Sequence, residues 1–442
     1  MRCRTNWTKF IQLLTTSIAV SVSLLSSSLL NSQELTETNG YPVFEQFGDP
    51  LPIDAPIATP DSDLFIPNGL GHRRTLAERG ILLDLDVTQF YQGVTSGGLE
   101  QRFRYGGHGD YVAKFDFDKL MGREGLFLQL RAEHRFGQAV NVDSGGLGAP
   151  AVLVNLPVLG REDVHLTNVV ITQALSEQFI LFAGKVDTLG GDLNDFAHGR
   201  GKTQFMNTNF VFNPIAVQTI PYSTLGAGFS FLQGTEPIFT FTVLNATDTS
   251  TTSGFDELFD EGVALSAELR LPTQLFGRRG HLGMGGAWNS REYISLGQDP
   301  RILEPDVPIA LTTDSWSLYW NVDHYLYVDP CDPRRGWGFF GRAGISDGNP
   351  NPIKWIASFG FGGNSPIRGR ELDRFGLGWY YGAASSELGP FFNPDSGTGG
   401  EFFYNIAVTP SIQITPDLQI INGSIPNTDT AVLFGLRANL AF

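Results

Sequence analysis

For most of its length the chain alternates apolar and polar residues with a period of two. In the last such segment, Phe434, Leu436 and Ala438 alternate with Gly435 and Arg437. Successive side chains of a β-strand point to opposite faces, so this pattern predicts strands with one apolar and one polar face. The 52 glycines among 442 residues agree with a fold that has many tight turns. The chain should therefore fold almost entirely into sheet.

The apolar faces of these strands must be covered by something other than water, and two arrangements can do this. They can pack on each other in a soluble β-sandwich, or they can meet lipid in a closed barrel. Charged residues such as Arg131, Glu133 and Arg135 stand in the middle of one polar face, where a water-filled lumen would receive them. Aromatic residues such as Trp316 and Tyr325 lie at strand ends, as at membrane interfaces. Both features favour the barrel.

The alternating segments predict sixteen strands and two kinds of connection. The strands start near residues 81, 103, 125, 165, 178, 224, 237, 261, 280, 314, 335, 352, 373, 400, 417 and 429. Tight turns are expected at Ser176-Glu177 and at Thr415-Pro416-Asp417, and long connections at 137–164, 188–223, 247–260, 290–313 and 386–399. Short periplasmic turns, long outer loops and an even strand number are typical of outer-membrane barrels. We therefore predict an all-β fold, a 16-stranded antiparallel transmembrane β-barrel.

The N-terminal region resembles an export signal followed by a linker. Arg2, Arg4 and Lys9 precede an apolar run from Ile11 to Leu30, as in a secretory signal peptide. We expect residues 1–32 to be cleaved, which takes the net charge from −16 to −19. Residues 33–80 are rich in Pro and Asp and are expected to form a periplasmic arm with one short helix. Residues 81–442 form the predicted barrel. No later segment has ~18 consecutive apolar residues, so no transmembrane helix is predicted there.

The composition excludes several classes of function. With a net charge of −16, the chain has no basic stripe for phosphates, and we expect no nucleic-acid partner. Removal of Cys3 leaves Cys331 as a single thiol, and no His-Glu-x-x-His motif is present, so we expect no metal and no cofactor. Aspartates such as Asp84 and Asp86 leave glycoside hydrolysis open. Acids on one strand face are nevertheless more typical of a lumen wall, so an enzyme is not expected.

Several short segments, taken in order, resemble the OprB family of carbohydrate-selective porins. They are residues 70–81, Phe182 to Asp187, Phe205-Met206-Asn207, Asn213-Pro214, and the closing segments 408–413, 417–419 and 435–442. Together the resemblance spans residues 70–442. It implies a sixteen-stranded outer-membrane barrel, often a homotrimer, that passes sugars. It also implies that the connection 188–223 folds into the lumen as a constriction loop.

Charged side chains on this loop and on the polar strand faces are the candidate site. Opposing charges across a narrow water path sort solutes, and the guanidinium fork of Arg can hydrogen-bond to vicinal hydroxyls. The predicted pore constriction or solute-lining residues are Asp192, Asp195, Arg200 and Lys202 in the loop, and Lys114, Arg131, Glu133, Arg135 and Arg437 on the wall. Asp116, Arg270, Arg342, Phe127, Tyr319 and Tyr380 are further wall candidates. The same charges could instead pair with each other and hold the loop.

Three functions are compatible with these features. The first is an outer-membrane porin for passive diffusion of small hydrophilic solutes, and of sugars in particular, with membrane lipid and solute as its partners. The second is a general or cation-favouring porin without a sugar site, suggested by the charge of the mature chain. The third is a barrel enzyme or a secreted sugar-binding sandwich. The first is the prediction that we carry forward.

Overall fold

A computed structural model describes residues 72–442, apart from residues 303, 305, 331 and 389–395. The predicted signal peptide, most of the predicted arm and Cys331 lie outside the described residues. The helix expected at the end of the arm is present as α3 (Arg73–Glu78). In the described part of the chain, no helix has both the length and the apolar character that a membrane span requires.

Sixteen antiparallel strands close into one barrel, as predicted. Each strand pairs with its neighbours in sequence, and β1 pairs with β16 to close the ring. The strands are β1 (Ile81–Ser96), β2 (Phe103–Asp116), β3 (Leu126–Gly137), β4 (His165–Ser176), β5 (Phe179–Asp187), β6 (Ser223–Gln233), β7 (Glu236–Asn245), β8 (Val263–Leu275), β9 (Arg278–Ile294), β10 (Leu311–Val328), β11 (Gly336–Ser346), β12 (Ile353–Asn364), β13 (Arg374–Ala384), β14 (Ser396–Thr409), β15 (Ile412–Asn422) and β16 (Ala431–Ala441).

The two faces of the strands are oriented as the alternation predicts. On β3, Arg131 and Glu133 point into the lumen and are buried, whereas Leu128 and Leu130 point outward and are half-exposed. On β16, Leu436 is 54% exposed while its neighbour Arg437 is fully buried. The apolar side chains therefore form the outer surface, where lipid would cover them, and this arrangement excludes the β-sandwich.

One predicted turn is wrong. The connection between β14 and β15 lies at Pro410-Ser411, and β15 starts at Ile412 and continues through Thr415-Pro416-Asp417. Pro416 pairs with Leu436 of β16, but the β14–β15 ladder has no pair at Pro416. A proline removes only one ladder donor, and the pairing on the other side of the strand keeps β15 in register. A proline therefore did not mark a turn here.

The predicted aromatic positions are only partly at the membrane interface. Trp316 is exposed on the outer surface, as expected, but Tyr325 is buried in the lumen and packs on Phe196 at a ring-centroid distance of 4.7 Å. The β10–β11 ladder shifts register between Tyr325 and Tyr327. The shift lies beyond Tyr325, which is in phase with the lumen-facing Tyr319, Asn321 and Asp323. Period two therefore directs Tyr325 inward, and its expected place at the interface was wrong.

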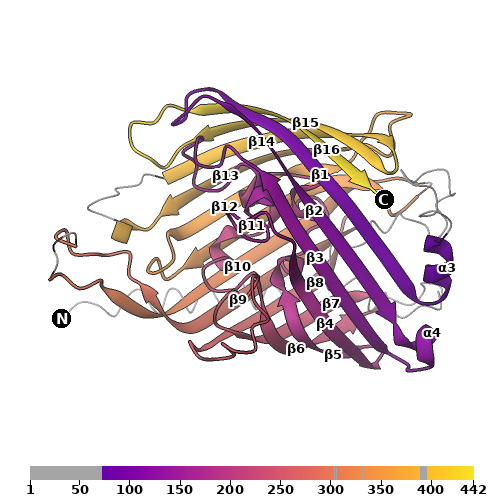
Figure 1. Ribbon diagram of the computed structural model, residues 1–442. Helices are drawn as coiled ribbons and strands as arrows, with labels where there is room; N and C mark the ends of the chain where they lie inside the picture. The colour runs from indigo at the N-terminus through magenta and orange to yellow at the C-terminus, as the bar shows by residue number, and fades with distance from the viewer. Residues whose placement is uncertain (1–71, 303, 305, 331, 389–395) are drawn as a thin grey trace.

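The two ends of the barrel carry different connections. Figure 1 shows α3, α4 (Phe117–Met121) in the β2–β3 turn, and the C-terminus at one end, with the long loops at the other. The alternation of short and long connections has exceptions, because the outer connections 97–102 and 347–352 are short and the turn 365–373 is long. Following the rule for this class of barrel, the end with α3 faces the periplasm.

Candidate functional site

Residues 188–222, here called loop 3, fold into the lumen between β5 and β6, as expected. Phe205, Phe210 and Ile215 of the loop are fully buried, and they pack on a layer of aromatic side chains that point inward from the wall. Phe205 lies 4.9 Å from Phe403 and 5.3 Å from Phe340, measured between ring centroids. Burial of these large apolar side chains inside the barrel holds the loop against the side of the lumen formed by β10 to β14.

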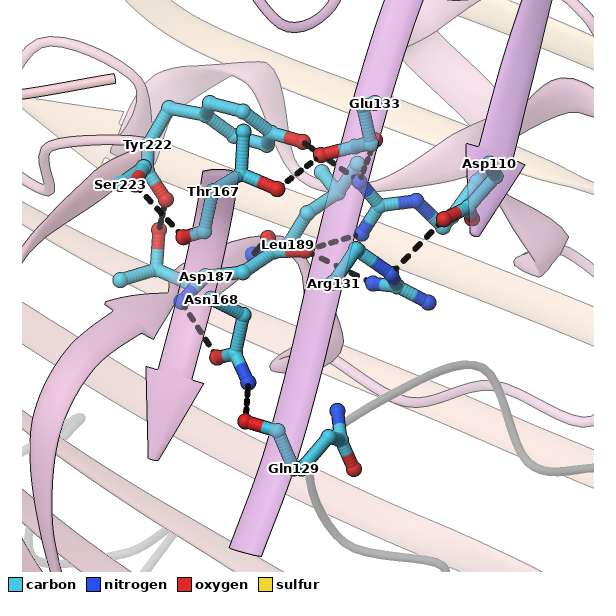
Figure 2. A network of polar contacts seen from close by, with 12 residues as sticks. Asp110, Gln129, Arg131, Glu133, Thr167, Asn168, Asp187, Leu189, Tyr222 and Ser223 are labelled. Carbon is cyan, nitrogen blue, oxygen red and sulfur yellow. Dashed lines mark hydrogen bonds and ion pairs between the residues drawn. The ribbon is translucent and has the colours of Figure 1, made fainter. Parts of the chain in front are cut away.

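On the opposite side of the lumen, a network of ion pairs ties loop 3 to β3 and β5. Arg200 Nη2 lies 2.7 Å from Glu133 Oε1, and its Nη1 lies 2.8 Å from Asp187 Oδ2. The Tyr222 hydroxyl donates to Glu133 at 2.6 Å, and burial raises the pKa of that hydroxyl, so it stays a donor. Figure 2 shows Glu133, Asp187 and Tyr222 pointing toward one another inside the barrel. Arg200 is therefore held by two carboxylates.

The network continues along β1 and β2 through a second arginine and a lysine. Arg131 bridges Asp110 and Asp187, with N–O distances of 3.1 and 2.7 Å. Lys202 Nζ lies 2.6 Å from Asp86 and 2.7 Å from Asp110. These charges are buried, and their pairing compensates for the free-energy cost of removing them from water. Their contacts are those of loop anchors.

Loop 3 is also anchored on the wall formed by β8 to β11. Asp192 accepts from Arg342 Nε at 2.7 Å and from the side-chain amide of Asn321 at 2.6 Å. Asp195 lies 3.1 Å from Arg270 Nη2. Two predicted loop acids thus meet two predicted wall arginines, which the sequence alone could not pair.

Side chains of β14 and β16 bind the backbone of loop 3. Glu401 on β14 accepts the N–H groups of Met206 and Asn207 at 2.6 and 2.8 Å. Arg437 on β16 donates to the carbonyl oxygens of Gly201 and Gln204. A loop enclosed in a barrel must have its backbone groups satisfied, and these side chains do so. Arg437 is therefore placed as a binder of loop backbone.

The remaining predicted wall residues lie elsewhere. Asp116 caps α4 by accepting from the backbone of Asp118 at 3.0 Å. Phe127 packs with Ile180 and Leu232 in a small apolar cluster. Arg135 donates to the carbonyl of Gly137. Tyr319, in contrast, lines the cavity described below, while Tyr380 packs on Phe210 of loop 3. Lys114 is buried on the inner face of β2.

A second loop folds inward, and sequence reasoning missed it. Residues 138–164, here called loop 2, carry the short 3-10 helix η2 (Val152–Asn155), whose Val152, Leu153 and Val154 are buried against loop 3 and the inner wall. The available signal was the apolar run Ala151 to Leu156, which is too apolar for an exposed outer loop. Loops 2 and 3 together fill much of the lumen.

A cavity, here called the channel cavity, lies between the two loops and the wall from β5 to β10. Its volume is about 580 Å³. The wall contributes Phe182, Thr240, Thr242, Leu244, Ser266, Glu268, Asn289, Arg291 and Tyr319, and the loops contribute Leu156, Leu159, Leu189, Asp192, Phe212 and Tyr222, among others. The lining therefore combines aromatic side chains with hydrogen-bonding groups, which suits a polyhydroxylated solute with apolar ring faces.

Of the nine predicted constriction residues, Asp192 is the one that lines this cavity in the described part of the chain. The other charged side chains of its lining are Asp187, Asp248, Glu268 and Arg291. Glu268 belongs to the polar face of β8, which the alternation had identified, but nothing in the sequence distinguished it from Arg270 two residues away. The cavity thus has four carboxylates against one guanidinium.

One group among the described residues has the composition of a metal site. Ligand atoms of Asp195, His281 and Asp323 lie within 4.8 Å of one another. Arg270 Nη2 lies 3.1 Å from Asp195 and 3.6 Å from Asp323. The guanidinium already supplies the positive charge that a metal would bring, so we interpret the group as an ion-pair cluster that anchors the loop.

Comparisons with known proteins agree with this geometry. A family model described as carbohydrate-selective porin, OprB family, matches residues 100–442. The high-pH structure of Pseudomonas putida OprB is 18% identical, with a TM-score of 0.73 over 86% of this chain and 98% of that chain. The low-pH structure of the same protein is 15% identical, with a TM-score of 0.54 and the same coverage. No curated protein matches the chain. At these identities the structural likeness concerns the fold.

Proposed function

The chain belongs to the OprB family of carbohydrate-selective porins, and we propose that sugars cross the outer membrane by passing through the channel cavity. The observation that carries this route is the position of the cavity, which lies between loop 3 and the wall from β5 to β10, where the ion-pair network and the aromatic layer leave space. Phe182, Phe212 and Tyr319 contribute aromatic side chains to its lining, the kind of group on which a pyranose packs. Members of this family are channels, and we propose no catalytic role.

The predicted site residues take two roles in this proposal. Asp192 borders the solute path, while Arg131, Glu133, Arg200 and Lys202 hold loop 3 in place and thereby set the width of that path. Asp195, through Arg270, and Arg437 also anchor the loop. Lys114 and Arg135 remain wall candidates. Cleavage after the signal peptide 1–32, a periplasmic arm at 33–80 and a homotrimer remain predictions, the last testable by cross-linking in detergent.

A substitution in the cavity tests the route. Thr242 on β7 lines the cavity, and the neighbouring Val243 points to the opposite face. Thr242→Trp would fill part of the space, so we expect the swelling rate of proteoliposomes in glucose to fall about tenfold, because flux depends steeply on the free cross-section of a narrow pore. The measurement is liposome swelling at matched protein content.

The matched control is Val243→Trp, which adds the same side chain on the lipid face and should leave glucose flux unchanged. If both variants pass glucose at the wild-type rate, solutes use another path. A wild-type glucose rate no higher than that of size-matched neutral solutes would instead favour the general porin. The four carboxylates of the cavity favour a cation-preferring version of that alternative, which a reversal-potential measurement in a KCl gradient would detect.

A further inference from the structure

The charges that line the channel cavity are not equally free to act on a solute. Asp187 is held by Arg131 and Arg200, and Asp192 by Arg342. Ion pairs of this kind cancel most of the field that either partner would project into the water path. Two of the four cavity carboxylates, Asp187 and Asp192, therefore project little net field into the path.

Glu268 is different, because only neutral groups bind its carboxylate. The backbone N–H of Asp192 donates to it at 3.0 Å and the Tyr319 hydroxyl at 3.1 Å. Arg270 points from the same face of β8, but its guanidinium is engaged by Asp195, Asp323 and Glu236. Within the described residues, Glu268 takes part in no ion pair. These contacts hold the carboxylate in place without a cation bonded to it.

Glu268 lies at one of the points where loop 3 contacts this wall. A Cβ atom placed on Gly191 of the loop would lie 3.5 Å from Glu268 Oε2. The following residue, Asp192, has a positive φ of 54° and directs its N–H at the same carboxylate. Thr240 on β7, which also lines the cavity, pairs with Glu268 across the strands and carries no charge.

The other unpaired charges of the lining lie toward the outer end of the cavity. Asp248 belongs to the outer loop after β7, is exposed, and accepts from the backbone of Ser223 at 2.9 Å. Arg291 lies near the outer end of β9, with its guanidinium 4.2 Å from the ring centre of Tyr293. These two charges have opposite signs.

We propose that Glu268 sets the charge selectivity of the path, so that neutral polyhydroxylated solutes and cations pass and anionic sugars, such as sugar acids, are slowed. The inference rests on the proposed route through the cavity. A neutral sugar can donate hydroxyl hydrogens to the carboxylate, whereas a carboxylate or phosphate on the solute meets a like charge in the cavity.

The test compares Glu268→Gln with wild type in two measurements. Liposome swelling with glucose and with gluconate gives the ratio of neutral to anionic flux, and the reversal potential in a KCl gradient gives ion selectivity. We expect the relative gluconate rate to rise about tenfold in Glu268→Gln and the preference for K⁺ over Cl⁻ to approach unity, because one charge without a bonded cation is removed from a narrow path.

Two further variants make the result interpretable. Glu261→Gln removes an exposed acid of the outer loop before β8 and should change neither ratio. Glu268→Asp keeps the charge on a shorter side chain and should keep both selectivities. Unchanged selectivity in Glu268→Gln, or equal loss in Glu268→Asp and Glu268→Gln, would overturn the assignment. Failure of the route itself shows differently, as wild-type glucose flux that Thr242→Trp does not reduce.

Discussion

Replacing Arg200 with alanine is expected to detach one side of loop 3 and to raise single-channel conductance. The substitution leaves Glu133 buried without the guanidinium that lies 2.7 Å from it, and removal of one member of a buried pair costs about 3–5 kcal/mol. Asp187 keeps Arg131 as a partner. The unpaired Glu133 carboxylate can regain solvation at the lowest free-energy cost if the loop moves away from β3 and admits water. This movement widens the lumen.

Planar-bilayer recordings would measure this increase, together with greater current noise from the released loop. The strand ladder does not involve Arg200, so heat-modifiable gel mobility should stay normal. Arg161→Ala serves as the control, because Arg161 is an exposed arginine of loop 2 and its loss removes the same charge. Wild-type conductance in Arg200→Ala would show that the aromatic layer alone fixes loop 3, and the anchoring role of the network would be wrong.

Replacing Leu436 with arginine is expected to reduce insertion of the barrel. Leu436 lies at the centre of β16 and is 54% exposed on the outer surface. An arginine on the lipid face near the membrane midplane costs about 2–4 kcal/mol. We therefore expect a smaller fraction of folded, heat-modifiable barrel after refolding into liposomes, measured over a series of urea concentrations.

The matched variant is Leu372→Arg, because Leu372 is exposed in the turn between β12 and β13 and outside the strands. An arginine there remains in water and should leave the folded fraction unchanged. Equal folding of both variants would mean that the outer face of β16 at Leu436 does not meet hydrocarbon, for example because another subunit or a polar cap covers it.

The strands could be predicted from the sequence because their pattern is local. A closed ring places every polar face inward and every apolar face outward, so period two determines both the strands and their orientation. Exceptions occur where local signals compete. Pro416 suggested a turn but lies inside β15, and Tyr325 suggested an interface aromatic although its phase along β10 directs it into the lumen. The pairing with β16 that keeps Pro416 in a strand involves another segment, so the sequence of β15 alone does not reveal it.

The candidate charged residues could be identified from the sequence, but their partners and roles could not. Arg200 and Glu133 are 67 residues apart and Lys202 and Asp86 are 116 residues apart, so nothing local indicates that they pair. Their polar character was enough to place them in the lumen. Whether each charge faces solute or another side chain depends on the course of loop 3 across the barrel.

The sequence by itself therefore determined the barrel, its strand number and the inward direction of its charged faces, because alternation along a strand is a property of neighbouring residues. The tertiary structure decided which part of the lumen stays open. Packing of loops 2 and 3 on the inner wall compensates most predicted charges and leaves Glu268 beside the path, since contacts between distant segments exist only once the ring is closed and filled.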